Sequence, residues 1–410
     1  MSLNEYSVEN LALKELGIRK LLKRARSEAM RTLKVFITDA RSRMCLTVAR
    51  SLGKAGYYVA VGDHETRRSL SFYSKFIRQS LLYPNPLISE GAFLKAVKRI
   101  ARHFDVIIPI LEKSMVPLAK NKEFLEGEGT RLLMPDAGPL EVAMDKYRLY
   151  IVANSAGVPC PKTLLIEDLR DLRRAVKEIG LPLVLKVRRE MSIPPEKRFA
   201  IIKAPDNLYL QAKRLLRIGG DSILAQEFIK GEKVGCFYLF NRHGDLVAYF
   251  CHHRLVETPG GISAFCESYF HAEALSNGLK LLKKLKWKGV AMAEFVIKED
   301  GKPMLLEVNP RFWGSLPLAI AAGVDFPRLL VETWDVKVNR PLGHYEHIRC
   351  LILMALLDML AISRSLKDVL SAFKVILENL SANTRIFELM ESDVAPFMIR
   401  AFGKTILGWL

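Results

Sequence analysis

The stretch AMAEFVIKEDGKPMLLEVNPRFWGS, residues 291–315, contains two short apolar runs separated by a turn around Asp300 and Gly301. Asp-Gly between strand-like runs is a strong hairpin signal, because a type I′ turn needs positive φ at both central residues. We therefore predict a β-hairpin with this dipeptide at its tip. The cross-strand pairs expected from that turn are Glu299 with Lys302, Ile297 with Met304 and Glu294 with Glu307.

The predicted hairpin sets two carboxylates, Glu294 and Glu307, directly opposite each other. Like charges in that position repel unless a cation neutralises them. Side chains alternate with a period of two along a strand, so Asn309 and Arg311 extend the same face if the strand continues. Such hard oxygen ligands suit Mg²⁺, which binds through a few protein groups and nucleotide phosphates. The alternative is that these side chains form the solvated outer face of a hairpin.

The composition is that of a globular protein with a basic surface. The 410 residues suffice for two to four domains, and half of them are hydrophobic. Lys and Arg number 62 against 44 Asp and Glu, a formal net charge of +18. Such a field favours nucleotides, acidic substrates, polyanions or anionic membrane surfaces. It is equally compatible with a protein that binds nothing larger than ATP.

Cysteine usage and hydropathy indicate a cytoplasmic protein. The six cysteines show no CxxC spacing, which argues against a disulfide or metal framework and suits a reducing compartment. The N-terminus is polar and has no secretory h-region. The longest apolar run, residues 350–362, is too short to span a bilayer.

Both termini combine leucine-rich and basic patterns. Residues 1–31 repeat Leu and Ile at roughly helical spacing, with Lys and Arg between them, and residues 395–410 behave similarly. A basic amphipathic helix can lie on a membrane surface or bind an acidic partner. The alternatives are a packed extension with a solvated basic face, a helix on the protein body, or a homodimer contact.

Residues 33–140 alternate strand-like and helix-like segments, which predicts a mostly parallel sheet of Rossmann-like type. The first strand–helix turn, residues 38–44, contains no glycine, so a dinucleotide site is disfavoured. A boundary falls near Pro135–Pro139. Residues 345–410 read mostly as helix.

Between these regions, Lys186 stands inside the apolar strand-like run Leu183–Val187. A buried lysine needs a partner, and a phosphate would serve. The alternative is an edge strand whose lysine extends outward to water. His252 and His253 are adjacent on a predicted strand and therefore point to opposite faces, so we expect one of them to face the cleft. Residues 258–263 have the composition of a lid.

In this order, the segments resemble the ATP-grasp superfamily of carboxylate–amine ligases, especially its carbamoyl-phosphate-synthase-like members of unknown substrate. The resemblance covers roughly residues 33–335. It is carried by MDK (144–146), GVPCP (157–161), LVLKV (183–187), AQEFIKGE (225–232), HHRLVE (252–257), GGIS (260–263), MAEF (292–295) and LLEVNPRFWGSLPLAIAAGVD (305–325).

The resemblance implies an α/β (α+β) fold with an N-terminal Rossmann-like preATP-grasp domain at residues 32–142. It implies an ATP-grasp domain of two α+β subdomains at 143–338. A basic extension at 1–31 and a C-terminal helical region at 339–410 flank these domains. The implied activity is activation of a carboxylate as an acyl phosphate and its coupling to an amine, most simply with an amino-acid substrate. ATP and one or two Mg²⁺ ions, or Mn²⁺ in their place, are the implied cofactors, and nucleic acid is not expected.

The resemblance also implies roles for particular residues. Lys146 and Lys186 would hold ATP phosphates, and Arg311 and Arg254 would stabilise the transferring phosphoryl group. The remaining assignments are Glu227, Phe228 and Ile229 for adenine, Glu232 for ribose, Glu294, Glu307 and Asn309 for Mg²⁺, and Gly260, Gly261 and Ser263 near the substrate.

One segment departs from the family pattern. The loop over the phosphates is usually glycine-rich, whereas residues 188–199 contain no glycine and include Pro194 and Pro195. Proline offers no backbone donor, so Arg188, Arg189, Lys197 or Arg198 would contact phosphate instead. This departure motivates the alternative of a catalytically altered nucleotide-binding protein acting at an acidic membrane surface or partner.

Overall fold

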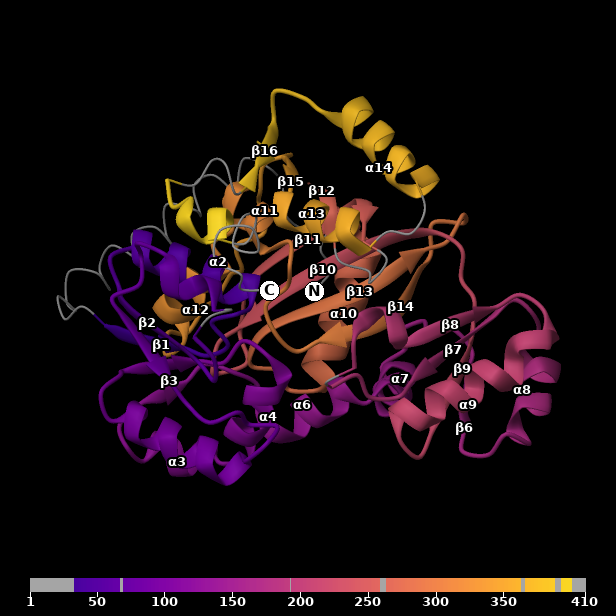
Figure 1. Cartoon of the computed structure of the whole chain (residues 1–410), viewed down its shortest axis with the longest axis horizontal. Coiled ribbons are helices and arrows are strands. Elements are labelled where there is room, and N and C mark those ends of the chain that lie inside the picture. Colours follow the sequence, from indigo (N-terminus) through magenta and orange to yellow (C-terminus); the bar gives the residue numbers. More distant parts are fainter. Residues whose placement is uncertain are drawn as a thin grey trace.

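The computed structural model describes residues 33–66, 69–191, 193–258, 263–362, 366–387 and 392–399. Its three sheets lie side by side in Figure 1, with the N-terminal sheet and the small second sheet on either side of the large third sheet. Both basic terminal segments, residues 1–31 and most of 395–410, lie outside the described residues. In the part of the chain that the structure describes, no helix is long and apolar enough to cross a membrane.

The N-terminal sheet is parallel, in the strand order β3-β2-β1-β4-β5, as the alternating pattern predicts. Its buried strands are apolar on both faces because helices cover each face. The strands are β1 (Lys34–Ile37), β2 (Tyr58–Asp63), β3 (Gln79–Leu82), β4 (Val106–Ile108) and β5 (Arg131–Leu132). The helices are α2 (Arg43–Lys54), α3 (Glu90–Ala101), α4 (Glu112–Lys120) and α5 (Lys122–Glu126).

The second sheet is small and antiparallel, in the order β6-β9-β7-β8. Alternate residues of β7 pack against helices α8 and α9, which leaves Lys186 on the opposite face. The helices α6 (Ala137–Met144) and α7 (Lys146–Ser155) connect the N-terminal sheet to it. Its elements are β6 (Thr163–Ile166), α8 (Asp171–Ile179), β7 (Leu183–Val187), β8 (Phe199–Ile202), α9 (Leu208–Gly219) and β9 (Ile223–Glu227).

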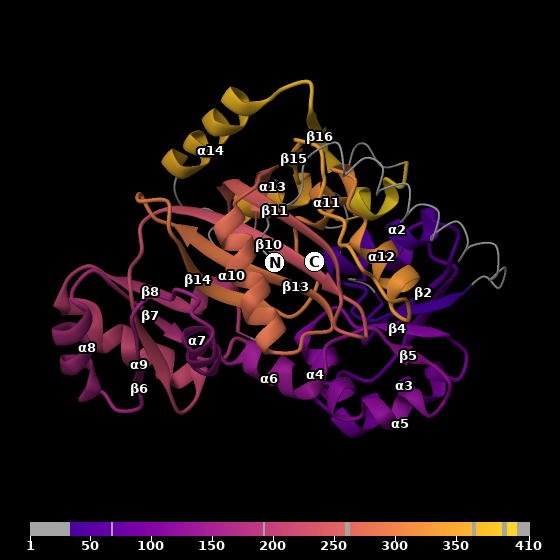
Figure 2. The same cartoon turned by 180° about the vertical axis from the view of Figure 1, so that it is seen from behind.

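The third sheet has seven strands in the order β14-β13-β10-β11-β12-β15-β16. Helix α10 covers one face, as Figure 2 shows, and α11 and α12 pack against the other. The strands are β10 (Glu232–Phe240), β11 (Leu246–Glu257), β12 (Ser263–Ser268), β13 (Gly289–Ile297), β14 (Pro303–Asn309), β15 (Arg349–Leu351) and β16 (Thr384–Ile386). The helices are α10 (Ala272–Lys284), α11 (Leu316–Ala321), α12 (Phe326–Thr333), α13 (Leu353–Ile362) and α14 (Leu366–Asn379).

These sheets confirm the predicted α/β class. They also include two strands that were not predicted from the sequence. The segment after residue 339 contains the expected helices α13 and α14, but also β15 and β16, which extend the large sheet beyond β12. Each of these strands has only three residues, too few to show a period in sequence. The large sheet is therefore completed by a region that reads as helical.

Candidate active site

The hairpin β13–β14 brings the two predicted carboxylates together, although its turn differs from the prediction. Gly301 has a φ of 80°, whereas Asp300 does not have positive φ, so the turn is not of type I′. Ile297 faces Pro303 instead of Met304. A bulge between Glu294 and Phe295 then restores the register, and Glu294 does face Glu307.

Each carboxylate of this pair contacts a cation. Glu294 accepts a hydrogen bond from Arg254, and Glu307 accepts one from Lys146 and one from the Asn309 amide at 3.0 Å. Burial and the neighbouring charge of Glu307 raise the pKa of Glu294. Burial alone would raise the pKa of Glu307 as well, but the charge and hydrogen bond of Lys146 lower it. The two cations thus offset the repulsion that the sequence leads us to expect.

Two carboxylates and one amide make a donor set that fits Mg²⁺. Among the described residues, no cluster of three His, Cys, Asp or Glu side chains is suited to hold a metal. A set of this size nevertheless suits Mg²⁺, which keeps several waters and takes further ligands from substrate phosphates. Lys146 and Arg254 now occupy the carboxylate oxygens that such an ion would use.

A cavity of about 260 Å³ separates the small sheet from the large sheet. Lys186 reaches into it from β7 and donates hydrogen bonds to the Tyr150 hydroxyl at 2.7 Å and to Gln226 at 2.8 Å. These partners are neutral, so burial and the charge of Lys146 lower the pKa of Lys186 to about 7. Among the predicted site residues, those that line this cavity are Lys146, Lys186, Glu227, Phe228, Ile229, Arg254, Glu294 and Glu307.

Two further cavities begin on the other side of Glu307. One, of about 380 Å³, extends toward the N-terminal sheet and includes Asn309 and Arg311. The other, of about 260 Å³, lies over β11 and includes Arg254, Arg311 and Ser263. Glu307 borders all three cavities, and so does Arg198 from the glycine-free loop.

Arg311 is held by the N-terminal domain. Its Nε donates a hydrogen bond of 2.6 Å to Glu112, the first residue of α4. The strand β14 ends at Asn309, so Arg311 is not part of the hairpin ladder but of the segment that follows it. Glu112 lies about 200 positions away in sequence, and no local pattern could have indicated this contact.

The glycine-free loop is only partly turned toward the cavities. Arg188 and Arg189 both donate to the buried Asp145, at 2.8 and 3.0 Å. Lys197 lines none of the three cavities. Arg198 does line them, and it contacts Glu190, which also pairs with Lys146 at 2.9 Å. Arg198 is therefore the loop cation that the structure brings to the site.

Two other predicted residues differ in their placement. Glu232 begins β10, outside the cavity between the small and the large sheet, and is 66% exposed, with its carboxylate 3.8 Å from His253. Gly260 and Gly261 lie outside the described residues. The expectation that one of the paired histidines faces the cleft is met by His252, which borders the cavity over β11.

His252 also stands in a row with the carboxylates. It faces Gly235 across β10–β11, Gly235 faces Glu294, and Glu294 faces Glu307. A Cβ at Gly235 would lie 2.6 Å from the His252 ring, so a larger residue there would displace the imidazole. Burial and the charge of Arg254 hold the pKa of His252 well below its usual value.

Comparison with known proteins gives both sequence and structural matches. Residues 223–349 match the family described as ATP-grasp in the biosynthetic pathway with Ter operon. A D-alanine–D-alanine ligase of Aromatoleum aromaticum is 29% identical over 209 residues, which are 46% of this chain and 64% of that protein. One from Nitrosospira multiformis is 27% identical over 210 residues, 47% of this chain and 66% of its own length. The chain thus covers less than two thirds of these relatives.

Solved structures share the fold at low identity. Biotin carboxylase from Campylobacter jejuni has a TM-score of 0.62 at 15% identity, covering 76% of this chain and 73% of its own. N5-carboxyaminoimidazole synthetase from Staphylococcus aureus has 0.61 at 16%, covering 77% and 81%. An L-amino acid ligase from Bacillus licheniformis has 0.58 at 17%, covering 74% of each chain. Residues 223–349 are therefore similar to an ATP-grasp family, and the described part of the chain shares its fold with these solved structures.

Proposed function

We propose that this protein is an ATP- and Mg²⁺-dependent ligase that activates a carboxylate as an acyl phosphate and joins it to an amine. The observation that carries the proposal is the position of Glu307, which borders one cavity between the small and the large sheet and two cavities beyond it. A nucleotide in the first cavity would present its terminal phosphate to the other two. Such a reaction needs room for an acid and an amine beside the nucleotide.

The nucleotide cavity has the groups that ATP requires. Lys146 and Lys186 supply two cations for the phosphates, and residues 227–229 form an edge where backbone groups can contact adenine. Glu232 remains the predicted ribose ligand, although it lies outside the cavity. Lys186 has only neutral hydrogen-bond partners, so phosphate oxygens would be its first anionic ligands.

Phosphoryl transfer depends on positioning and charge neutralisation more than on a covalent group from the protein. A carboxylate repels an incoming amine and has a poor leaving group, and conversion to an acyl phosphate removes both obstacles. Arg254 lines one of the two outer cavities and Arg311 lines both, and they would stabilise the transferring phosphoryl group. For this they must release Glu294 and Glu112, their partners in the present structure.

Glu294, Glu307 and Asn309 would hold Mg²⁺. The ion supplies charge neutralisation at the nucleotide phosphates. Its binding would compete with Lys146 and Arg254 for the carboxylates and would free both cations to move toward phosphate.

The names of the similar proteins support amino acids as substrates. The sequence relatives are D-alanine–D-alanine ligases, and one structural neighbour is an L-amino acid ligase. We propose an amino acid as the acid, the amine or both. We also predict that the protein is cytoplasmic and that its domains have the boundaries predicted from the sequence.

The proposal is tested by screening for ADP release with pooled amino acids, carboxylates and amines in the presence of Mg²⁺. We expect ADP to form only with a particular acid–amine pair. Glu307→Gln should abolish turnover, because it removes a metal ligand and the partner of Lys146. The matched control is Glu299→Gln, the same change at an exposed position of the same hairpin, which should retain turnover. Full turnover in Glu307→Gln would contradict the metal assignment.

The alternative of a catalytically altered nucleotide-binding protein at a membrane rests on the basic termini, most of which lie outside the described residues, and on the glycine-free loop at residues 188–199. The described site favours the ligase instead, because the cations and carboxylates of four chain segments meet around Glu307. Salt-sensitive binding to anionic vesicles that is lost on removal of residues 1–31 and 395–410 would support the alternative.

A further inference from the structure

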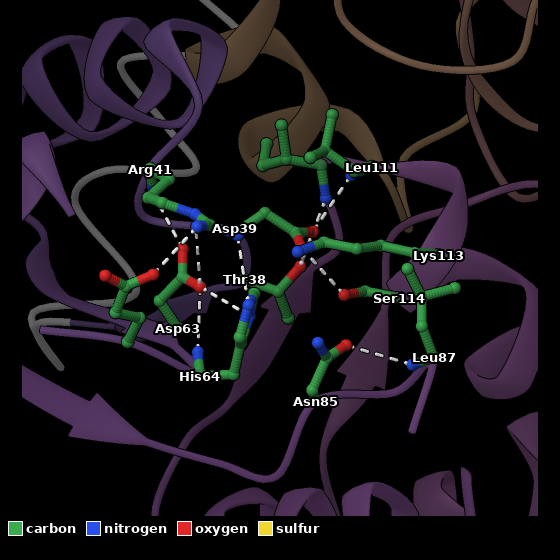
Figure 3. Close-up of polar contacts among 12 residues, drawn as sticks. Thr38, Asp39, Arg41, Asp63, His64, Asn85, Leu87, Leu111, Lys113 and Ser114 are labelled. Atoms are coloured by element: carbon green, nitrogen blue, oxygen red, sulfur yellow. Dashed lines mark hydrogen bonds and ion pairs between the residues drawn. The ribbon is translucent and has the colours of Figure 1, made fainter. Parts of the chain in front are cut away.

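Polar side chains gather at the carboxyl edge of the N-terminal sheet, in the loops that follow β1, β2, β3 and β4 (Figure 3). This sheet reverses its strand order between β1 and β4, since β2 and β3 lie to one side and β5 to the other. Ligands of open parallel sheets bind in the crevice at such a switch point. The predicted roles of the ATP-grasp residues use none of these side chains.

The floor of this cluster is a fully buried carboxylate, Asp39. It accepts hydrogen bonds from the Thr38 hydroxyl at 2.6 Å, the Leu111 amide at 3.0 Å and the Ser114 hydroxyl at 2.9 Å. The Lys113 ammonium lies 3.5 Å from the Asp39 Oδ1, the oxygen that also accepts from Ser114. Asp39 has a φ of 62°, an uncommon conformation for a residue other than glycine, and these contacts hold it there.

A second buried carboxylate, Asp63, fixes the other half of the cluster. It accepts hydrogen bonds from the backbone amides of Arg41 and His64, both at 2.8 Å. The His64 Nε2 accepts a 3.0 Å hydrogen bond from the Arg41 guanidinium, which also pairs with Glu65 at 2.9 Å. Burial and the charge of Lys113 lower the pKa of His64, so the imidazole is neutral and Arg41 and Lys113 carry the positive charge.

The groups left to face solvent are donors. Arg41 and Lys113 line the cavity of about 380 Å³, and so does Asn85, whose Oδ1 already accepts from the Leu87 amide at 3.0 Å. In the part of the chain that the structure describes, the Asn85 Nδ2 has no hydrogen-bond partner. Asp39 and Asp63 are below the surface and saturated with donors. Arg41, Lys113 and Asn85 therefore offer N–H groups to the cavity, and the carboxylates that line it, Glu112, Glu190 and Glu307, are paired with Arg311, Arg198 and Lys146.

We infer that Arg41, Lys113 and Asn85 bind a second anionic group of the substrate, a carboxylate or a phosphate remote from the carboxyl group that reacts. The inference rests on the proposed function and names the class of acid or amine that the site takes. The same cavity includes Asn309, Arg311 and Glu307, so one molecule can occupy both ends. None of the three binding side chains carries a carboxylate that could bind a cation. An anion, in contrast, meets a guanidinium, an ammonium and an amide donor.

The buried carboxylates favour selective rather than general anion binding. They hold Arg41 and Lys113 in place before the ligand arrives, which reduces the conformational entropy lost on binding. They also balance much of the positive charge, so bulk anions are not strongly attracted. Recognition then depends on hydrogen bonds in a fixed geometry, as for a group that forms part of a larger molecule.

The test compares binding of matched pairs that differ only in the remote group. The probes are glutamate and glutamine, aspartate and asparagine, adipate and its monoamide, and O-phosphoserine and serine, each titrated into the full chain with Mg²⁺ and ADP. A hydrogen bond to a charged group changes affinity by about tenfold to a hundredfold. We expect the wild type to bind the anionic member of at least one pair tighter by that factor, and the phosphoserine pair distinguishes phosphate from carboxylate.

Asn85→Asp is the sharpest variant. Its carboxylate can still accept from the Leu87 amide, so the loop is retained, but a donor is replaced by a negative charge. We expect the anionic member to lose at least tenfold in affinity while the neutral member is unchanged. Arg41→Gln should have the same effect and Arg41→Lys should restore part of it. The control is Arg102→Gln, which removes an arginine paired with Glu128 on the same domain but outside the cavity.

The outcomes separate this inference from the proposed function. Equal binding within every pair, no binding of any anionic probe, or an anion preference that survives Asn85→Asp and Arg41→Gln would overturn the inference. ADP release with an acid–amine pair that lacks a second anion would leave the ligase function intact and remove only the inference. Anion-selective binding without ADP release from any pair would support the inference and contradict the ligase function.

Discussion

Lys186 illustrates how a single residue can be prepared for a ligand. This lysine lies in an apolar strand, and its sequence context predicts a phosphate partner. Among the described residues, its hydrogen-bond partners are Tyr150 and Gln226. A buried ammonium without an anion loses part of its proton affinity, which is why its pKa falls to about 7. The cost of this arrangement to stability is expected at a binding site.

The lowered pKa of Lys186 predicts a pH dependence of nucleotide binding. The ammonium must be protonated to attract phosphate, so binding is strongest below pH 7 and weakens as the pH rises through 7. We expect the Kd of a non-hydrolysable ATP analogue to rise by up to about tenfold per pH unit between pH 7.5 and 9, with proton uptake on binding. Calorimetry in buffers of different ionisation enthalpy measures both.

Lys186→Arg is the control for this effect, because a guanidinium stays charged over the whole range. Its binding should show little pH dependence above pH 7.5. A wild-type Kd that stays constant from pH 7 to 9 would mean that Lys186 keeps its proton without a nucleotide.

At the scale of elements, the small sheet and the large sheet meet at the short connection between β9 and β10. Gly231 lies in this connection, next to the cavity-lining residues Phe228 and Ile229. A Cβ on Gly231 would lie 2.0 Å from the carbonyl oxygen of Ile297, at the end of β13. The close approach of the connection to the hairpin therefore requires glycine.

Gly231→Ala should displace this connection and weaken nucleotide binding, with at least a tenfold rise in the Kd of ATP. Gly301→Ala is the matched control, because Gly301 lies at the tip of the same hairpin with no atom within 4 Å of an added Cβ. Its positive φ makes alanine cost about 1 kcal/mol of stability. We expect thermal unfolding to detect both changes and nucleotide titration to detect only the first. Equal Kd values for the two variants would argue against a role of the connection in binding.

At the scale of the whole molecule, residues from distant parts of the sequence hold the N-terminal sheet to the C-terminal segment. Arg50 of α2 and Asp393 are both almost fully buried and form an ion pair of 2.9 Å. Asp393 also accepts from the Ser74 hydroxyl at 2.5 Å and the Lys75 amide at 3.0 Å. A buried charge that loses its partner is expensive, whereas an apolar replacement of both partners often is not.

Asp393→Leu should therefore lower the free energy of unfolding by about 3 kcal/mol, because Arg50 stays buried without its anion. The double variant with Arg50→Met should recover most of this loss. The control is Glu378→Ala, which breaks an exposed helical pair with Lys374 and should cost less than about 1 kcal/mol. Denaturant titration measures all three, and a double variant no more stable than Asp393→Leu would contradict a charge-based cause.

Much of the site could be predicted from sequence because its groups lie on local, periodic elements. The period of a strand puts Glu307 and Asn309 on one face, and the hairpin sets Glu294 against Glu307. The turn type was wrong, yet a bulge compensates for the shifted register. Periodicity also predicts the parallel order of the N-terminal sheet, but it cannot detect three-residue strands such as β15 and β16.

The sequence by itself determined the order of segments that resembles the ATP-grasp superfamily, the parallel N-terminal sheet and the opposed carboxylates. Each of these follows from local propensity and from contacts across a short turn. Only the tertiary structure decided which cations meet those carboxylates, that Arg311 pairs with Glu112 and that Arg198 is the cation of the glycine-free loop that lines the cavities. It alone placed Arg41, Lys113 and Asn85 on the same cavity, because these contacts join loops far apart in the chain and depend on how the sheets pack.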